Sequence, residues 1–331
     1  MNMQTNGRRA HFLFSFGPHR DARDFARAKE AADSFRPHVY SPESASLTYS
    51  QRVNEFVPSN KGLRKARKEA YLKRAILANF ESEQSQRHDY EFQREQLRYT
   101  LEASSEPVFY PLEAHETSFH RGNMEKINHF HMDSIRKASL NDLGAAKSQM
   151  HESIKLFTES NRKRDLDIVR NMENFVPELF SLFSSLQRFD PLRIFVRLGT
   201  LHENVFKMVQ DAYAGHPKVI LNRHRHEADN ALLPFEQAQW DSLAGMQVRD
   251  EQLLRSVLAF ILMEKYGNEI GGRENYSKEP LVHKVSYGLA VPQIEGLVRA
   301  NAIKDQKADL RLWLNSITTQ AEILVGIRPS N

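Results

Sequence analysis

Two histidines follow closely after a glycine at the end of an apolar stretch. His19 comes two residues after Gly17, and His202 comes three residues after Gly199. Both stretches are typical of buried strands, and glycine at a strand end allows a tight turn and the close approach of a ligand. Ligands of open α/β sheets bind beyond the carboxyl ends of the strands. We therefore expect the two imidazoles to meet at one edge of a sheet, where histidine can bind a metal or transfer protons.

Two glutamates end other short apolar stretches, each directly after or close behind a proline. Glu43 follows Val39 and Tyr40, and Glu113 follows Phe109. Together the four strand ends supply two imidazoles and two carboxylates, a set suited to general acid–base chemistry or to a divalent metal. The metal ligands we expect are His19, Glu43 and His202. The alternative is structural, because carboxylates at strand ends often cap the next helix.

The remaining sequence indicates elements that position these residues. We expect a helix over residues 21–35 between the first two strands, which makes a βαβ unit with parallel strands. The expected strands cover residues 11–16, 37–40, 107–110, 193–198 and 218–221. Further helices are expected over residues 62–103, 123–155, 162–186, 204–213, 251–266, 292–302 and 305–325, and Pro177 should kink or interrupt the helix over 162–186.

The predicted fold class is α/β, with a central and mainly parallel sheet flanked by long helices and an α-helical C-terminal section. We expect an α/β core with inserted long helices over residues 1–230. Residues 231–331 form the helical section, which we expect to pack on the core because no flexible linker separates the two.

Composition excludes several classes of site and protein. The chain has no cysteine, so disulfides, thiolate nucleophiles and Cys-based metal sites are excluded. No apolar run approaches the ~18 residues of a membrane-spanning helix. The apolar run near the N-terminus is too short for an export signal, and this predicts a cytoplasmic location. Walker A, Gly-x-Gly-x-x-Gly, His-Glu-x-x-His and Gly-x-Ser-x-Gly motifs do not occur.

The net charge is +4, and the first hundred residues hold 18 Lys and Arg against 12 Asp and Glu. The densest basic stretch, residues 61–74, is typical of a solvated helix face. Because no aromatic-basic RNA signature stands out, we do not expect a nucleic-acid partner. Engagement of nucleic acid through residues 61–74 stays open as a weaker alternative.

The order of these motifs resembles a known superfamily. Gly17-Pro18-His19, Ser41-Pro42-Glu43, Arg164-Asp165 on a helix, and Gly199-Thr200-Leu201-His202 follow one another as they do in erythromycin esterases, ChaN-like haem-binding proteins and TraB/Tiki-type proteins. The first motif of these families usually has its histidine three residues after the glycine, whereas this chain has Arg20 there.

The resemblance implies a hydrolase-like enzyme with an unknown small-molecule or peptide substrate. His19 or His202 would activate a water, directly or through a divalent metal. Glu43 would act as base or metal ligand, Glu113 would orient a histidine or the ligand, and Arg164 would stabilise an anion. Arg164 can equally be a helix-surface residue.

The alternative function is a non-catalytic protein on the same scaffold, which binds haem, an anionic ligand or a protein partner. Haem is the less favoured cofactor. The sequence leaves the oligomeric state open.

Overall fold

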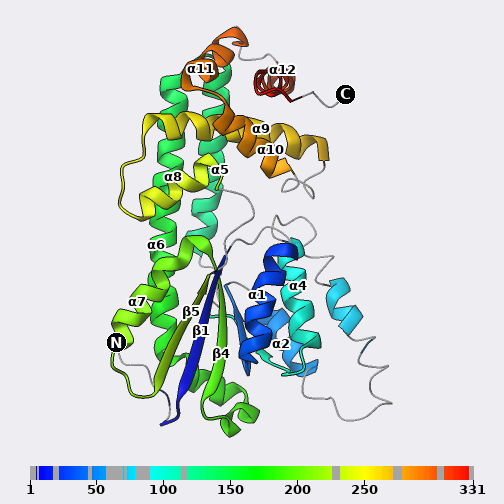
Figure 1. Cartoon of the computed structure of the whole chain (residues 1–331), viewed down its shortest axis with the longest axis vertical. Coiled ribbons are helices and arrows are strands. Elements are labelled where there is room, and N and C mark those ends of the chain that lie inside the picture. Colours follow the sequence, from blue (N-terminus) through cyan, green and yellow to red (C-terminus); the bar gives the residue numbers. More distant parts are fainter. Residues whose placement is uncertain are drawn as a thin grey trace. The chain divides into compact units, whose positions relative to one another are not determined.

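The computed structural model describes residues 5, 7–17, 22–43, 47–56, 70, 73–79, 90–112, 118–225, 232–270, 278–303 and 309–327 (Figure 1). The chain forms two compact units, each described here by itself. Unit 1 comprises Met1–Glu116 and Lys163–Ala228, and unit 2 comprises Thr117–Arg162 and Asp229–Asn331.

Unit 1 is built on a five-stranded sheet in the order β3-β2-β4-β1-β5, in which every pair of neighbouring strands is parallel. The strands are β1 (Ala10–Gly17), β2 (Val39–Pro42), β3 (Val108–Phe109), β4 (Leu192–Gly199) and β5 (Val219–Arg225). The expected α/β fold with a parallel sheet is therefore confirmed, and so are all five strands, with ends shifted by a few residues.

One face of the sheet packs against α6 (Leu143–Leu182) and α7 (Glu203–Tyr213). Side chains alternate between the two faces of a strand, so Phe12, Phe14 and Phe16 of β1 all lie on this face, beside Val196 of β4. Ile168 belongs to the apolar stripe of α6 that covers these rings. The resulting layer packs α6 against this face of the sheet.

The opposite face packs against α1 (Ala22–Phe35) and α4 (Tyr90–Glu102). Phe25 of α1 lies edge-on to Phe92 of α4, with 5.9 Å between the ring centroids. Tyr40 of β2 lies buried beneath them, and its hydroxyl donates to Gln96 at 3.0 Å. A further helix, α2 (Leu47–Phe56), contacts β3 through Asn54, whose amide bonds both backbone groups of Phe109. The short edge strand is held in place in this way.

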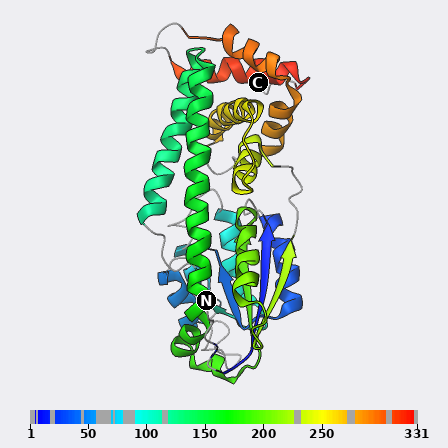
Figure 2. The same cartoon turned by 90° about the vertical axis from the view of Figure 1, so that its left-hand side faces the viewer.

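Unit 2 is helical and is organised around α9 (Asp250–Ile270), whose buried side chains lie on nearly all sides of the helix. Around α9 lie α5 (Ser118–Ser139), the first half of α6, α8 (Pro234–Leu243), α10 (Glu279–Gly288), α11 (Val291–Ala300) and α12 (Leu310–Leu324). Figure 2 shows α5 running beside α6. No helix in the described part of the chain is both long and apolar enough to cross a membrane.

The helical expectations differ from the structure in several places. The helix expected over 123–155 is two helices, because the chain turns at Asn141, which has a positive φ of 61°. The helix expected over 162–186 begins earlier, at Leu143, and α6 continues through Pro177 without interruption. The structure adds α2, α8 and α10, for which no helix was expected. Residues 61–69, 71 and 72 of the basic stretch lie outside the described residues.

The division into units also differs from the predicted boundary at residue 230. Residues 117–162, which the sequence assigned to the α/β core, belong to the helical unit. The cause is apolar burial: Ile135 of α5 and Met150 of α6 are buried in one cluster with Leu254 and Val257 of α9.

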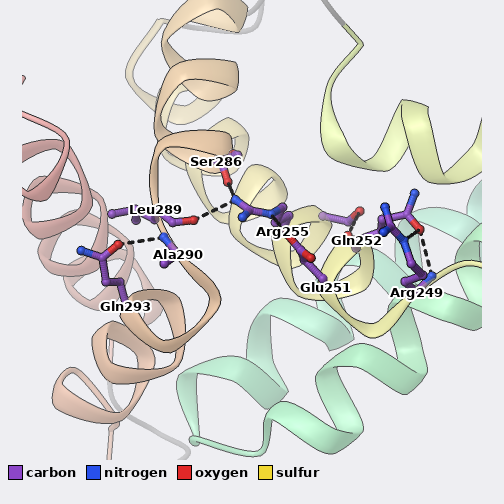
Figure 3. Close-up of polar contacts among 9 residues, drawn as sticks. Arg249, Glu251, Gln252, Arg255, Ser286, Leu289, Ala290 and Gln293 are labelled. Carbon is purple, nitrogen blue, oxygen red and sulfur yellow. Dashed lines mark hydrogen bonds and ion pairs between the residues drawn. The ribbon is translucent and has the colours of Figure 1, made fainter.

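The end of α10 depends on Arg255 of α9, shown in Figure 3. Its Nη1 donates to the carbonyl oxygens of Ser286 at 2.6 Å and Leu289 at 2.8 Å. Its Nε donates to Glu251 at 2.9 Å, one turn earlier on α9. Carbonyls at a helix end have no partner within the helix, so the guanidinium satisfies groups that would otherwise stay unpaired.

We expect Arg255→Ala to lower the free energy of unfolding of unit 2 by about 2 kcal/mol, since hydrogen bonds from a charged donor contribute roughly 1.5–3 kcal/mol. Both tryptophans of the chain, Trp240 and Trp313, lie in unit 2, so urea unfolding followed by tryptophan fluorescence reports on it. The control is Arg311→Ala at an exposed position of α12, with a change within about 0.5 kcal/mol. Equal unfolding midpoints for the two variants would contradict the assignment.

Candidate functional site

The two glycine-ended strands lie side by side, as the sequence predicts. β1 pairs with β4, and Gly17 lies opposite Gly199 in the register. The turns that follow both glycines therefore start at the same edge of the sheet, called here the carboxyl-terminal edge. His19 lies outside the described residues, so the meeting of the two histidines remains a prediction.

Glu43 lies at this edge directly after β2, and three donors converge on its carboxylate. The backbone N–H of Gly199 donates to Oε2 at 2.6 Å. Oε1 accepts from Arg164 Nη2 at 3.2 Å and lies 3.2 Å from His202 Nε2. The side chain of Glu43 is only 15% exposed, so the carboxylate is held in one position by charge and by backbone.

His202 lies in the short 3₁₀ turn Thr200–His202 between β4 and α7, and its ring is buried. On the side away from Glu43, its Nδ1 lies 2.5 Å from Asp165 Oδ1. The imidazole thus lies between two carboxylates, one on each ring nitrogen. This arrangement needs a proton on both nitrogens, which is the imidazolium form.

The pKa of His202 reflects this position. Burial lowers the pKa because it disfavours the charged ring, but the charge of Glu43 and the hydrogen bonds to Asp165 and Glu43 outweigh burial and raise the pKa to about 9. Arg164 opposes them in part. At neutral pH His202 is therefore a fixed cation, and it cannot accept a proton from water.

Arg164 and Asp165 are neighbours on α6, and both reach the site. Successive helix residues point about 100° apart. Asp165 faces inward and bonds His202 directly, whereas Arg164 needs its long side chain to reach Glu43. The alternative in which Arg164 is a helix-surface residue does not fit, because its side chain is 14% exposed.

A second buried cation, Arg197 of β4, lies close to the same site. Its Nη1 donates to the carbonyl oxygens of Ser15 at 3.1 Å and Leu198 at 2.5 Å. Its guanidinium carbon lies 5.0 Å from the centre of the Phe92 ring. Burial lowers the pKa of Arg197 to about 10, against the opposing charges of Glu43 and Asp24. The negative charge of Glu43 is thus surrounded by positive charge.

The structure brings together three of the five predicted site residues, namely Glu43, Arg164 and His202. Glu113, like His19, lies outside the described residues. The backbone before it is held near α6, because Asn171 Nδ2 donates to the carbonyl oxygen of Leu112 at 3.1 Å.

Sequence reasoning missed two members of the site. Asp165 had a signal, since it follows Arg164 in the helix motif, but it was not among the expected site residues. Arg197 also had a signal in the sequence, because it is a charged residue in the middle of an otherwise apolar strand. Such a residue requires buried partners.

The described residues contain no group of three or more His, Asp or Glu side chains that could hold a metal ion. His202 in this arrangement has no free lone pair for a metal, because both nitrogens face carboxylates. His202 therefore does not fit the predicted metal set as it stands. A metal held by His19 with Glu43 remains a prediction, since His19 is not described.

No protein-family model matches the chain, and no match is found among curated proteins or solved structures. The resemblance to the erythromycin esterase, ChaN-like and TraB/Tiki-type superfamily therefore stays a prediction carried by the motifs.

The raised pKa of His202 predicts how stability depends on pH. A group whose folded pKa exceeds its unfolded value of 6.5 stabilises fully below pH 6.5, and this contribution is lost as pH rises toward about 9. We expect the wild-type chain to lose on the order of 3 kcal/mol between pH 6.5 and 9.5, and His202→Gln to lack this loss.

Urea unfolding at several pH values, followed by circular dichroism, measures this difference. The histidines whose pKa is lowered, His11, His38, His131 and His224, have their effect below pH 6.5 and do not interfere. Parallel stability curves for wild type and His202→Gln over this range would rule out a charged His202.

Removing one carboxylate should lower the pKa of His202. We expect Asp165→Asn to bring it below about 9, because the ring loses a charged hydrogen-bond acceptor. Titration of the histidine ring carbons by NMR measures the shift, and the signal missing from His202→Gln identifies the residue. An unchanged pKa would show that Asp165 does not hold the proton on Nδ1.

Proposed function

We propose that the chain is a hydrolase that acts at the carboxyl-terminal edge of its sheet on an ester-like bond of a small molecule or peptide. The observation that carries this proposal is the Glu43 carboxylate, which is fixed by Arg164, His202 and the Gly199 amide beside the end of β1. The order of motifs shared with erythromycin esterases supports the same reading.

In the proposed reaction His19 is the general base. Since His202 is already protonated, it is His19 that takes a proton from water, while the water oxygen attacks the carbonyl carbon. The bond to the leaving oxygen then breaks, and the proton on His19 passes to that oxygen. Glu43 orients the imidazole or the water, and His202 keeps Glu43 in position.

Positive charge at the edge assists the same step. The tetrahedral intermediate carries a negative oxygen, and a preorganised cation stabilises such charge most strongly where water is excluded. Arg164 is mostly buried and supplies this charge. The non-catalytic alternative with haem has less support from His202, because neither of its ring nitrogens is free to act as an axial ligand.

The test is hydrolysis of a panel of p-nitrophenyl esters, lactones and peptide nitroanilides by the purified chain. We expect His19→Ala, Glu43→Gln and His202→Gln each to lower kcat/KM about 100-fold or more on any substrate that is turned over. Matched controls are Glu55→Gln and His129→Gln at exposed positions, which should keep full activity.

Circular dichroism confirms that each variant is folded. Absence of turnover over the whole panel, or full activity in Glu43→Gln, contradicts the proposal. Loss of activity in His19→Ala alone likewise contradicts the proposal, because it would remove Glu43 and His202 from the reaction.

A further inference from the structure

A cluster of cations lies at the edge of the sheet opposite to the His202 site. Because all strands are parallel, the residues at their amino ends share one edge. We call the following set the amino-terminal rim: Arg8 and Arg9 before β1, Arg36 and His38 before β2, Arg188, Phe189 and Arg193 around the start of β4, and Lys218 before β5.

The positive charge of the rim is largely uncompensated. Asp190 is the one carboxylate that pairs with a rim cation within the described residues, and it lies 3.3 Å from Arg9 Nε. Hydrogen bonds from Arg9, with the charges of Arg9 and Arg8, lower the pKa of Asp190, so it remains ionised. Arg36 and Arg188 are exposed and have no ion pair in the described part of the chain. An anion that approaches this edge therefore meets several cations, and the carboxylates next to the strand starts are Asp190 and the exposed Glu106, which precedes β3.

Flat rings lie among these cations. The His38 ring stacks on Phe189, with 3.7 Å between centroids and 12° between planes. The guanidinium carbon of Arg188 lies 4.7 Å from the centre of the same Phe189 ring. Burial, with the charges of Arg193 and Arg188, lowers the pKa of His38 to about 4, so its ring is neutral at physiological pH. The half-buried rings of His38 and Phe189 thus lie at the amino-terminal rim, with the Arg188 guanidinium beside them.

Backbone contacts hold this arrangement together. Arg193 Nε donates to the carbonyl oxygen of Arg36 at 2.9 Å, and the Arg193 backbone N–H donates to His38 Nδ1 at 3.1 Å. The second bond requires a lone pair on Nδ1, which agrees with a neutral ring. Arg193, the His38 ring and the backbone at Arg36 are therefore held together by β4.

We propose that the amino-terminal rim binds single-stranded nucleic acid, with phosphates on the arginines and a base against the Phe189, His38 and Arg188 group. Proteins that bind single strands combine a cationic track with rings on which bases stack, and arginine adds cation–π contacts. A lipid surface or an acidic peptide supplies anions but no planar base for the rings. The proposal is independent of the hydrolase function, because the rim uses none of its residues.

The test measures the anisotropy of fluorescein-labelled oligo(dT) and oligo(U) of about 20 nucleotides with the full chain, over a range of salt concentrations. The variant is the double substitution Arg36→Ala with Arg188→Ala. The matched control is Arg299→Ala with Arg311→Ala, two exposed arginines of α11 and α12 without an ion pair in the described structure. Each double variant removes two positive charges.

We expect the rim double to bind about 10-fold or more weakly and the control double to bind as wild type does. The slope of log K against log salt should fall by about 1.4 for the rim double, since each phosphate contact on a single strand contributes about 0.7. Arg188→Lys keeps the charge but loses the planar group, so it should weaken binding while the slope is retained.

Three results would overturn the proposal. One is no binding of either oligonucleotide by the wild-type chain at low salt. The second is an equal loss of affinity in the rim and control doubles. The third is binding to vesicles that contain phosphatidylserine, lost in the rim double, without binding to oligonucleotides, which would assign the rim to a membrane surface.

Discussion

A buried positive charge persists inside a protein only where anions lie within hydrogen-bonding distance of it. His202 meets this requirement with two carboxylates, Glu43 on one ring nitrogen and Asp165 on the other. Glu43 directly follows β2 and Asp165 lies on α6, and the two residues are more than a hundred positions apart in the chain. The ion cluster therefore joins three elements of unit 1. Each must bring its side chain to the same height along the strands for the charge of His202 to be compensated.

The register of the parallel strands sets this height. Gly17 and Gly199 end at the same height, and Pro42 lies opposite Arg197, so Glu43 emerges one residue before the level of the Gly199 amide. The apolar face beneath fixes α6, which then delivers Asp165 and Arg164 to the edge. Catalytic geometry at such an edge is thus a property of strand lengths and of helix packing as much as of the side chains themselves.

The features of the fold that the sequence predicted are those that depend on local sequence pattern. The strands were recognisable from short apolar runs that end at glycine or proline, and Glu43 and His202 were recognisable because they follow those ends. The break at Asn141 and the helix α10, which begins beside Pro280, depend on turn chemistry and on packing around α9, and the periodicity of the sequence does not contain them. Assignment of residues 117–162 to unit 2 likewise depends on long-range contacts.

The two site residues that sequence reasoning missed differ in kind. Asp165 follows Arg164, and a charged pair on a helix is typical of solvent-exposed surface, so only the tertiary position of α6 reveals that Asp165 points inward. Arg197 interrupts an apolar strand. The cost of burying its guanidinium is offset by the carbonyls of Ser15 and Leu198, the Phe92 ring and nearby negative charge, and of these only Leu198 is a neighbour in sequence.

The cations at the two edges of the sheet differ in how their charge is compensated, and this difference affects which ligands each edge can bind. At the carboxyl-terminal edge, Arg164 and His202 are largely removed from water, so each is matched by an internal carboxylate. At the amino-terminal rim, Arg36 and Arg188 stay in water, where hydration replaces an ion pair. The hydrated cations Arg36 and Arg188 can exchange water for an external phosphate without breaking an internal ion pair. Binding of a polyanion is therefore compatible with the rim and unfavourable at the His202 edge, where the ligand would have to displace Glu43.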